Sequence, residues 1–255
     1  MSKLLCVDFD FFFPTVDLPR HDGDMEWSLY DWGHAENKLF IEVLWPLRAA
    51  AFLQRDLPLP TLSGEQEGFW DRFNISPQAE IFVAESNSLA AHPDISFGRG
   101  QVDEVWLYDA HHDSGYNNED PDALLDAGQW SCENWMVLYH GIGADLHVRY
   151  PSWKTRILDM EPQPIVPVDR QMDGNDNGPI HEFDHVFICR SGAWVPPWLD
   201  RAFFEFVATA PGGELRTLGD YPALKARDFS LESAHVMAKQ SKELWDIQAA
   251  QAALS

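Results

Sequence analysis

The sequence predicts an α/β protein with a three-layer α/β/α fold around a mostly parallel central sheet. Three observations lead to this class: short apolar runs recur along the chain, most of them lack strict alternation of apolar and polar residues, and helical stretches lie between them. A strand without alternation is buried on both faces, which is typical of a parallel sheet covered by helices. With 255 residues, the chain is long enough for one large domain of this kind.

Five apolar runs are expected to be strands, and most end in polar or acidic residues. They lie at residues 3–9, 80–84, 102–108, 144–150 and 185–189. Four helices are expected, at residues 36–53, 132–139, 198–208 and 230–254. The first helix carries apolar residues three and four positions apart, as an amphipathic helix does, and Pro46 is expected to kink or split it.

Two stretches are expected to be irregular, because proline, glycine and polar residues dominate them. They lie at residues 57–67 and 161–179, and the second contains the run Asp-Gly-Asn-Asp-Asn-Gly. The strand and helix signals on either side of each stretch are of one kind. We therefore predict a single domain over residues 1–255 with irregular insertions near 57–67 and 161–179.

The chain is strongly acidic, with 41 Asp and Glu residues against 18 Lys and Arg and a net charge of −23. Phosphate groups would oppose this field, so neither nucleic acid nor a membrane is an expected partner. A small-molecule substrate is expected instead, and the charge favours a cationic one. An apolar share of 45% with 13% aromatic residues excludes a disordered chain. A homo-oligomer is compatible with the sequence, which does not determine the oligomeric state.

The cysteines and the first residues of the chain bear on its compartment. Cys6, Cys132 and Cys189 are odd in number and widely spaced, which offers neither a disulfide framework nor a CxxC zinc site. The first apolar run is short and ends in an acid, unlike a signal peptide. No window reaches the ~18 uninterrupted apolar residues of a membrane span. A cytoplasmic location is therefore expected.

Two clusters of candidate metal ligands lie where predicted strands end. Asp8 and Asp10 end the first strand, and Asp109, His111 and Asp113 follow the third. Functional groups of an open parallel sheet gather at its carboxyl edge, and carboxylates with an imidazole suit Mn²⁺, Zn²⁺ or Fe²⁺ better than Ca²⁺. Buried carboxylates also need a cation or several donors to offset their desolvation. The structural alternative is that these acids cap turns or helices, while the histidine is exposed.

The two clusters carry a resemblance to a known superfamily. Residues 109–113, Asp-Ala-His-His-Asp, resemble the Asp-Ala-His-x-Asp motif of the arginase/ureohydrolase and histone-deacetylase superfamily. Residues 6–14, Cys-Val-Asp-Phe-Asp-Phe-Phe-Phe-Pro, resemble its Ser-x-Asp-x-Asp-x-x-Asp-Pro strand at the two central acids and the proline. The resemblance implies an arginase/deacetylase-like fold that holds one or two divalent metal ions, Mn or Zn.

The same resemblance implies a role for each candidate ligand. Asp8 and Asp109 would each bridge two metal ions. Asp113 would complete the shell of one ion, and Asp10 with His111 that of the other. If one site is degraded, Asp8, Asp109 and His111 would remain, similar to the mononuclear zinc site of the deacetylases.

The chain departs from the superfamily's pattern in three ways. The Asp-rich strand comes before the Asp-Ala-His motif, which implies a permuted strand order. The Gly-Gly-Asp-His turn that supplies a further histidine ligand is missing, and Asn87 stands where that histidine would fall. The same segment also resembles the Glu-Val-Asn strand that binds guanidinium groups in arginases, which would make Glu85 a substrate contact. Where a catalytic histidine is expected, residues 131–135 offer Glu133 and Asn134 instead.

The candidate catalytic residues are therefore Glu85, Glu133 and His34. His34 lies in Trp-Gly-His-Ala-Glu before a predicted helix, at a position similar to a substrate-contact turn of the superfamily. Its alternative interpretation is a surface histidine at the start of a helix.

These residues predict a metal-dependent hydrolase that acts on a C–N bond through a metal-activated water, with a guanidino, amidine or acyl-amine substrate. One alternative is a catalytically inactive protein of the same fold that binds a metal or another ligand. Another is a phosphatase similar to the haloacid dehalogenases, with Asp8 as nucleophile, Asp10 as acid–base group and Mg²⁺ bound. Residues 11–12, Phe-Phe, replace the Gly-Thr of that family, and it leaves the cluster at 109–113 unexplained.

Overall fold

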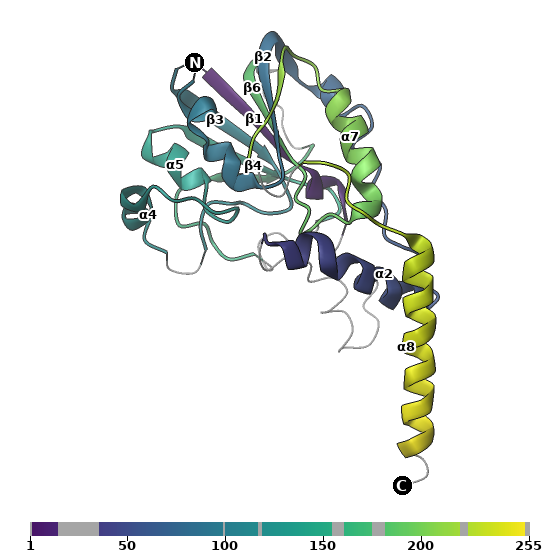
Figure 1. Cartoon of the computed structure of the whole chain (residues 1–255). Helices are drawn as coiled ribbons and strands as arrows, with labels where there is room; N and C mark the ends of the chain where they lie inside the picture. Colours follow the sequence, from purple (N-terminus) through teal and green to yellow (C-terminus); the bar gives the residue numbers. More distant parts are fainter. Residues whose placement is uncertain are drawn as a thin grey trace.

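Seven strands form one sheet in which every pair is parallel, and helices cover both faces (Figure 1). The computed structural model describes residues 2–14, 36–98, 100–116, 119–154, 161–174, 182–219 and 224–252, with residues 244–252 described by backbone alone. The strands are β1 (Ser2–Asp8), β2 (Asn74–Ala84), β3 (Val102–Tyr108), β4 (Asp145–Tyr150), β5 (Asp169–Met172), β6 (Glu182–Cys189) and β7 (Leu215–Thr217). The predicted three-layer α/β/α class is confirmed.

The strand order is β5-β4-β3-β1-β6-β2-β7, which places β1 in the middle of the sheet. From β1 the chain crosses to β2 on one side of it, and from β2 it returns to β3 on the other side. The direction of winding therefore reverses between β1 and β3. Such a switch point is where an open α/β sheet offers a crevice for ligands at the carboxyl ends of its strands.

Helical segments connect the strands. They are η1 (Phe9–Phe12), η2 (Leu39–Val43), α2 (Leu44–Gln54), η3 (Phe69–Arg72), η4 (Asn87–Ala91), α3 (Pro93–Ser96), α4 (Pro121–Ala127), α5 (Met136–Gly141), η5 (Pro197–Leu199), α7 (Asp200–Ala208) and α8 (Leu231–Ala252). In the described part of the chain, no helix combines the length and apolar character needed to cross a membrane.

Successive residues of the central strands supply two separate cores. On β1, Leu5 and Val7 pack with α2, η3 and α7, whereas Leu4 and Cys6 pack with η4, α3 and α5. All four side chains are fully buried. Because both faces of the sheet need apolar side chains, these strands show the continuous apolar runs seen in the sequence.

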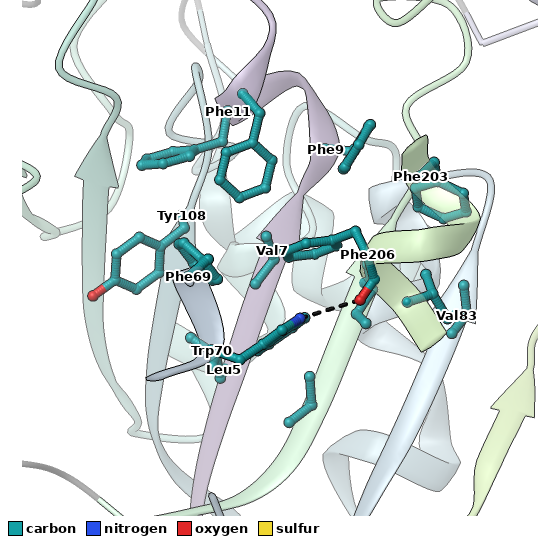
Figure 2. Packing of buried hydrophobic residues seen from close by; sticks show 14 of the residues in the cluster. Leu5, Val7, Phe9, Phe11, Phe69, Trp70, Val83, Tyr108, Phe203 and Phe206 are labelled. Atoms are coloured by element: carbon teal, nitrogen blue, oxygen red, sulfur yellow. Dashed lines mark hydrogen bonds between the residues drawn. The ribbon is translucent and has the colours of Figure 1, made fainter. Parts of the chain in front are cut away.

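The first core is rich in aromatic rings. Figure 2 shows Phe9 and Phe11 beside rings from η3 and α7, and the indole N–H of Trp70 donates to the carbonyl oxygen of Phe206 at 3.1 Å. The Trp70 and Phe206 rings stack with centroids 4.6 Å apart. Edge-to-face and stacked pairs of this kind fix ring orientations beyond simple burial. These ring contacts hold the segment after β1 in place against η3 and α7.

The expected helix over residues 36–53 is two segments. Residues Leu39–Val43 form a π-helical turn, and α2 follows from Leu44. Pro46 lies in the first turn of α2, where its missing N–H is tolerated. Residues 38–54 are helical without a break, so the structure has a π-helical turn before Pro46 in place of the predicted kink or split.

Two edge strands were not predicted. The stretch 161–179, expected to be irregular, contains β5, and β7 also lacks an apolar run. Both are short strands at the edges of the sheet, with partly exposed or exposed residues, so burial imposes little apolar pattern on them. The expected helix at 132–139 begins later, because residues 132–135 form a turn before α5.

The last helix, α8, packs against α2 and extends away from the sheet (Figure 1). Its start agrees closely with the predicted helix at 230–254.

Candidate functional site

The two acidic clusters of the sequence come together at the carboxyl edge of the sheet, at its switch point. Asp8 and Asp10 end β1 and begin η1, and Asp109, His111 and Asp113 follow the neighbouring strand β3. We call these five residues the acidic cluster. The residues after β6 and β2, the next two strands, complete the surroundings.

Local hydrogen bonds fold each motif around one point. The Asp8 carboxylate caps η1 by accepting from the backbone N–H of Asp10 at 3.1 Å. Asp10 accepts from the backbone N–H of Ala110 at 3.3 Å, and Asp109 accepts from that of His111 at 2.8 Å. The capping role weighed from the sequence is thus real for Asp8, and it occurs together with convergence of the acids.

A single amide group joins three of the carboxylates. The side-chain nitrogen Nδ2 of Asn87 lies 2.6 Å from Asp8 Oδ2, 3.1 Å from Asp109 Oδ2 and 2.9 Å from Asp113 Oδ2. Asp8 and Asp113 each accept one bond from another side chain, Ser191 Oγ at 2.9 Å and the indole N–H of Trp135 at 2.8 Å respectively. Acids that are separated by about a hundred residues in the sequence therefore share one small volume.

His111 lies at the rim of the cluster. Its Nδ1 is 3.1 Å from Asp10 Oδ2 and 3.4 Å from Asp109 Oδ1, and 39% of its side chain is exposed. Asp10, Asp109 and His111 each offer a ligand atom within 4.8 Å of the other two, as a metal site requires. The ring of Trp194 lies nearby, with its centroid 6.1 Å from that of His111.

The surroundings shift the pKa values of the acids in two directions. Burial, with repulsion from neighbouring carboxylates, raises the pKa of Asp8 and Asp109 well above the ordinary range, and burial raises the pKa of Asp113 to about 7. Burial also opposes ionisation of Asp10, but its hydrogen bond and attraction to His111 outweigh this and lower its pKa. Burial would lower the pKa of His111, but Asp10 outweighs that effect and raises it.

Backbone strain is concentrated at the same place. Asp113 and Ser191 have φ angles of 45° and 56°, in the left-handed region that most non-glycine residues avoid. Both side chains contribute to the cluster, through Asn87 and through Asp8 respectively. Strain of this kind persists where the surrounding structure fixes it, and it is typical of functional sites.

A second layer of polar groups holds the 109–113 loop. The carboxylate of Glu161 accepts from the backbone N–H of His112 at 2.9 Å, from Tyr116 Oη at 2.7 Å and from Tyr150 Oη at 2.5 Å. Lys154 donates to the carbonyl oxygen of Ala110 and lies 3.7 Å from Glu161. These bonds fix the loop that carries Asp109, His111 and Asp113.

Glu85 has a different environment from the one expected of a substrate contact. Its carboxylate pairs with the guanidinium of Arg190, with Nε at 2.8 Å, and accepts from the backbone N–H of Gly192 at 2.8 Å. Glu85 and Arg190 are 5% and 1% exposed. A Cβ at position 192 would lie 2.1 Å from Glu85 Oε1, so only glycine permits this approach. The carboxylate of Glu85 therefore anchors the loop after β2, and its substrate role stays a prediction.

Of the other catalytic candidates, the structure describes Glu133 and Asn134. Glu133 is exposed in the turn before α5, and His34 lies outside the described residues. Asn134 is buried, accepts from the backbone N–H of Ser131 at 2.9 Å and donates to Glu119 at 3.2 Å. Among the described groups, no hydrogen bond joins Glu133 or Asn134 to the acidic cluster.

Sequence reasoning missed Ser191 and Glu36. Ser191 lies two residues after the end of β6, so the carboxyl-edge rule could have found it. Glu36 hydrogen-bonds to Ser86 and Cys132, and burial raises its pKa to about 7. No local pattern in the sequence marks that position.

The donor set of this site fits a divalent cation. Four carboxylates and one imidazole converge from two neighbouring strands, and the buried Oδ1 of Asn87 has no hydrogen-bond donor among the described residues. Carboxylate oxygens with one histidine are ligands for Mn²⁺, Zn²⁺ or Fe²⁺. The arrangement can therefore bind a cation at the edge of the sheet and present it beside the partly exposed His111.

A scan against protein-family models found no matching family, and searches of curated proteins and of solved structures found no match.

Proposed function

We propose that this protein is a divalent-cation-dependent hydrolase that breaks a C–N bond in a guanidino, amidine or acyl-amine substrate. The observation that carries the proposal is the convergence of Asp8, Asp10, Asp109, His111 and Asp113 at the switch point of a parallel sheet. The resemblance of the two motifs to the arginase and deacetylase superfamily supports the choice of a C–N bond.

The acidic cluster is the set of residues that would hold the cation, as one or two ions of Mn²⁺ or Zn²⁺. A bound cation of this kind supplies Lewis acidity, which lowers the pKa of a water molecule so that hydroxide is available near neutral pH. Burial raises the pKa of Asp8, Asp109 and Asp113, and a bound cation would favour the ionised form of these carboxyl groups.

The residues of the chain have separate tasks in this proposal. Asp10 orients the ring of His111 through the 3.1 Å contact with Nδ1, and the exposed part of that ring marks the side from which a substrate approaches. Trp194 stands beside this approach. In the overall reaction, water adds to the carbon, the C–N bond breaks and the amine leaves with a proton. The proton-transfer role of Glu133 or His34 stays a prediction.

The charge of the protein supports a cationic substrate. A net charge of −23 raises the local concentration of cations and steers them toward the surface. Guanidino and amidine groups carry a positive charge at neutral pH, whereas an acyl-amine has no such advantage.

Metal analysis of the purified protein, combined with a substrate panel, tests the proposal. We expect one or two Mn or Zn ions per chain, lost in Asp8→Ala and Asp109→Ala, with turnover on a guanidino, amidine or acyl-amine compound. The matched control is Asp126→Ala, because Asp126 is exposed on α4 and should leave the metal content unchanged.

Three outcomes would contradict the proposal in different ways. Absence of first-row ions from protein purified without chelator removes its basis. Turnover of phosphate esters with Mg²⁺ alone favours the phosphatase alternative, with Asp8 as nucleophile. Bound Mn or Zn without turnover across the whole panel favours a non-catalytic binding protein.

A further inference from the structure

The side chain of Asn87 has more hydrogen-bond acceptors at its nitrogen than it has protons. Three carboxylate oxygens, from Asp8, Asp109 and Asp113, lie 2.6, 3.1 and 2.9 Å from Nδ2. A primary amide carries two N–H bonds, so this nitrogen cannot donate to all three carboxylates at once. The nitrogen occupies the place where a cation would be shared by three anionic oxygens.

The oxygen atom of the same amide lacks a hydrogen-bond donor. Oδ1 of Asn87 is buried, and no donor reaches it among the described residues. The side chain as a whole is 2% exposed, so water does not readily replace the missing partner. Half a turn about the Cβ–Cγ bond exchanges the two ends, and Oδ1 then faces the three carboxylates.

With Oδ1 turned inward, this part of the cluster offers only oxygen atoms. Two oxygen ligands of one octahedral ion lie about 3 Å apart when each bond is about 2.1 Å long. The distances of 2.6, 2.9 and 3.1 Å around the Asn87 amide are close to this separation. Oxygen-only sites suit Mg²⁺ and Mn²⁺, whereas the group of Asp10, Asp109 and His111 includes an imidazole, which suits Zn²⁺ and Mn²⁺.

We propose that Asn87 closes an oxygen-only cation subsite and exchanges between two roles. Without a cation, its N–H groups hold Asp8, Asp109 and Asp113 together. When Mg²⁺ or Mn²⁺ binds, the amide turns and Oδ1 becomes a ligand. The inference rests on the cation site of the proposed function, and it adds that the two subsites share Asp109 but differ in selectivity.

Because Asn87 has these two roles, the two subsites should differ in their affinity for a cation. The subsite with His111 is filled first, because its ligands are already oriented by the contact between His111 and Asp10. The Asn87 subsite is filled second, because the amide must first give up its bonds to the carboxylates. Asn87 begins η4 two residues after Glu85, whose pairing with Arg190 anchors the backbone there, so the proposed exchange is a rotation of the amide alone.

Titration with Mn²⁺ alone, followed by calorimetry and by electron paramagnetic resonance, tests this inference on the chelator-treated full chain. We expect two equivalents in the wild type, the second at least about tenfold weaker. Asn87→Asp removes the N–H donors and adds a carboxylate, so it should strengthen the second equivalent by about tenfold and lower the Tm in chelator. Added Mn²⁺ should restore that Tm.

A second variant and a control keep the test decisive. Asn87→His should shift the second equivalent toward Zn²⁺ over Mg²⁺, and it decides the question if Asn87→Asp does not fold. Asn134→Asp is the matched control, because Asn134 is also a buried amide but has partners at both ends. It should leave both Mn²⁺ affinities unchanged.

The opposing results separate this inference from the function it rests on. If Asn87→Asp and Asn87→His leave the second Mn²⁺ affinity unchanged, or if the wild type binds one equivalent, Asn87 is a structural link and the inference fails. In either case the cation site itself stands. If the wild type binds none of Mn²⁺, Zn²⁺ and Mg²⁺, the proposed function fails before any variant is measured.

Discussion

Two groups of buried charged side chains lie at the same edge of the sheet and differ in how their charge is balanced. The first, which we call the arginine network, consists of Glu85, Arg190, Asp200 and Arg227. Arg190 joins Glu85 to Asp200, and Arg227 contacts Asp200 with Nε 3.1 Å from Oδ2. Two acids thus meet two arginines. In the described part of the chain, by contrast, no lysine or arginine forms an ion pair with the four carboxylates of the acidic cluster.

The two groups differ in whether their buried carboxylates are paired with arginines of the protein. Asn87, which contacts three acids of the acidic cluster, is only two residues from Glu85, which is paired with Arg190. The arginine network satisfies its carboxylates within the fold, which is the usual condition for buried charge. In the proposed function, the carboxylates of the acidic cluster bind a cation instead of a side chain of the protein.

The largest expected effect comes from breaking the balanced group. Glu85→Gln leaves Arg190 with one acid instead of two and turns an N–H group toward either Arg190 or the backbone N–H of Gly192. Loss of one partner of a buried pair costs about 3–5 kcal/mol of unfolding free energy. Chemical denaturation should show this loss equally with Mn²⁺ and with chelator. A loss confined to the chelator sample would place Glu85 in the cation site after all.

The same type of substitution should act in opposite directions in the two groups. Asp113→Asn removes one of several repelling carboxylates and keeps an acceptor for Trp135, and asparagine tolerates the φ of 45° well. In chelator at pH 8 it should stabilise the protein by about 2 kcal/mol. Asp200→Asn, in the arginine network, should destabilise it by a similar amount under the same conditions.

Thermal denaturation with added Mn²⁺ completes this test. The Asp113→Asn variant should gain less from the ion than the wild type, so that its advantage in chelator disappears or reverses. A variant that is less stable than the wild type in chelator would show that Asp113 serves the fold rather than the cation.

The strands that build the edge were predictable because burial on both faces leaves an apolar run. The predicted ranges 102–108 and 185–189 match β3 and the end of β6 closely. The edge strands β5 and β7 could not be found in this way, because partial exposure leaves no such run. Residues 3–9 also gave the strand that carries Asp8, with its end shifted by one residue.

In the candidate site, too, the features with a local sequence pattern were predictable and those that depend on tertiary structure were not. Asp8, Asp10, Asp109, His111 and Asp113 were identified because each motif is local in the sequence and follows a strand. Whether the motifs meet depends on the strand order, which no local pattern encodes. The substrate role of Glu85 came from the resemblance of its segment to a Glu-Val-Asn strand. Its pairing with Arg190, 105 residues away, could not be predicted, because such a pairing leaves no pattern in either segment.

The smallest of the expected effects depends on pH and lies just outside both groups. Burial raises the pKa of Glu36 from 4.5 to about 7. As the pH rises, the unfolded chain therefore releases this proton near pH 4.5, whereas the folded protein keeps it until about pH 7. The stability contributed by neutral Glu36 is fully present below about pH 4.5 and is lost as the pH rises through about 7. Glu36→Gln keeps an acceptor for Ser86 Oγ and removes the titration.

In chelator, we expect Glu36→Gln to match the wild type at pH 4 and to exceed its unfolding free energy at pH 8. The shift corresponds to about 3 kcal/mol, which the partial exposure of Glu36 reduces to roughly 1–2 kcal/mol. Glu42→Gln is the matched control, because the Glu42 side chain on the neighbouring η2 is 39% exposed and its one ion pair, with Lys38, is at the surface, so this variant should leave the pH dependence unchanged. A difference between Glu36→Gln and the wild type that is the same at both pH values would assign the effect to packing. A difference that grows between pH 4.5 and 7 would show that the edge of the sheet holds a further carboxyl group in its neutral form, beside the arginine network that keeps its own acids paired.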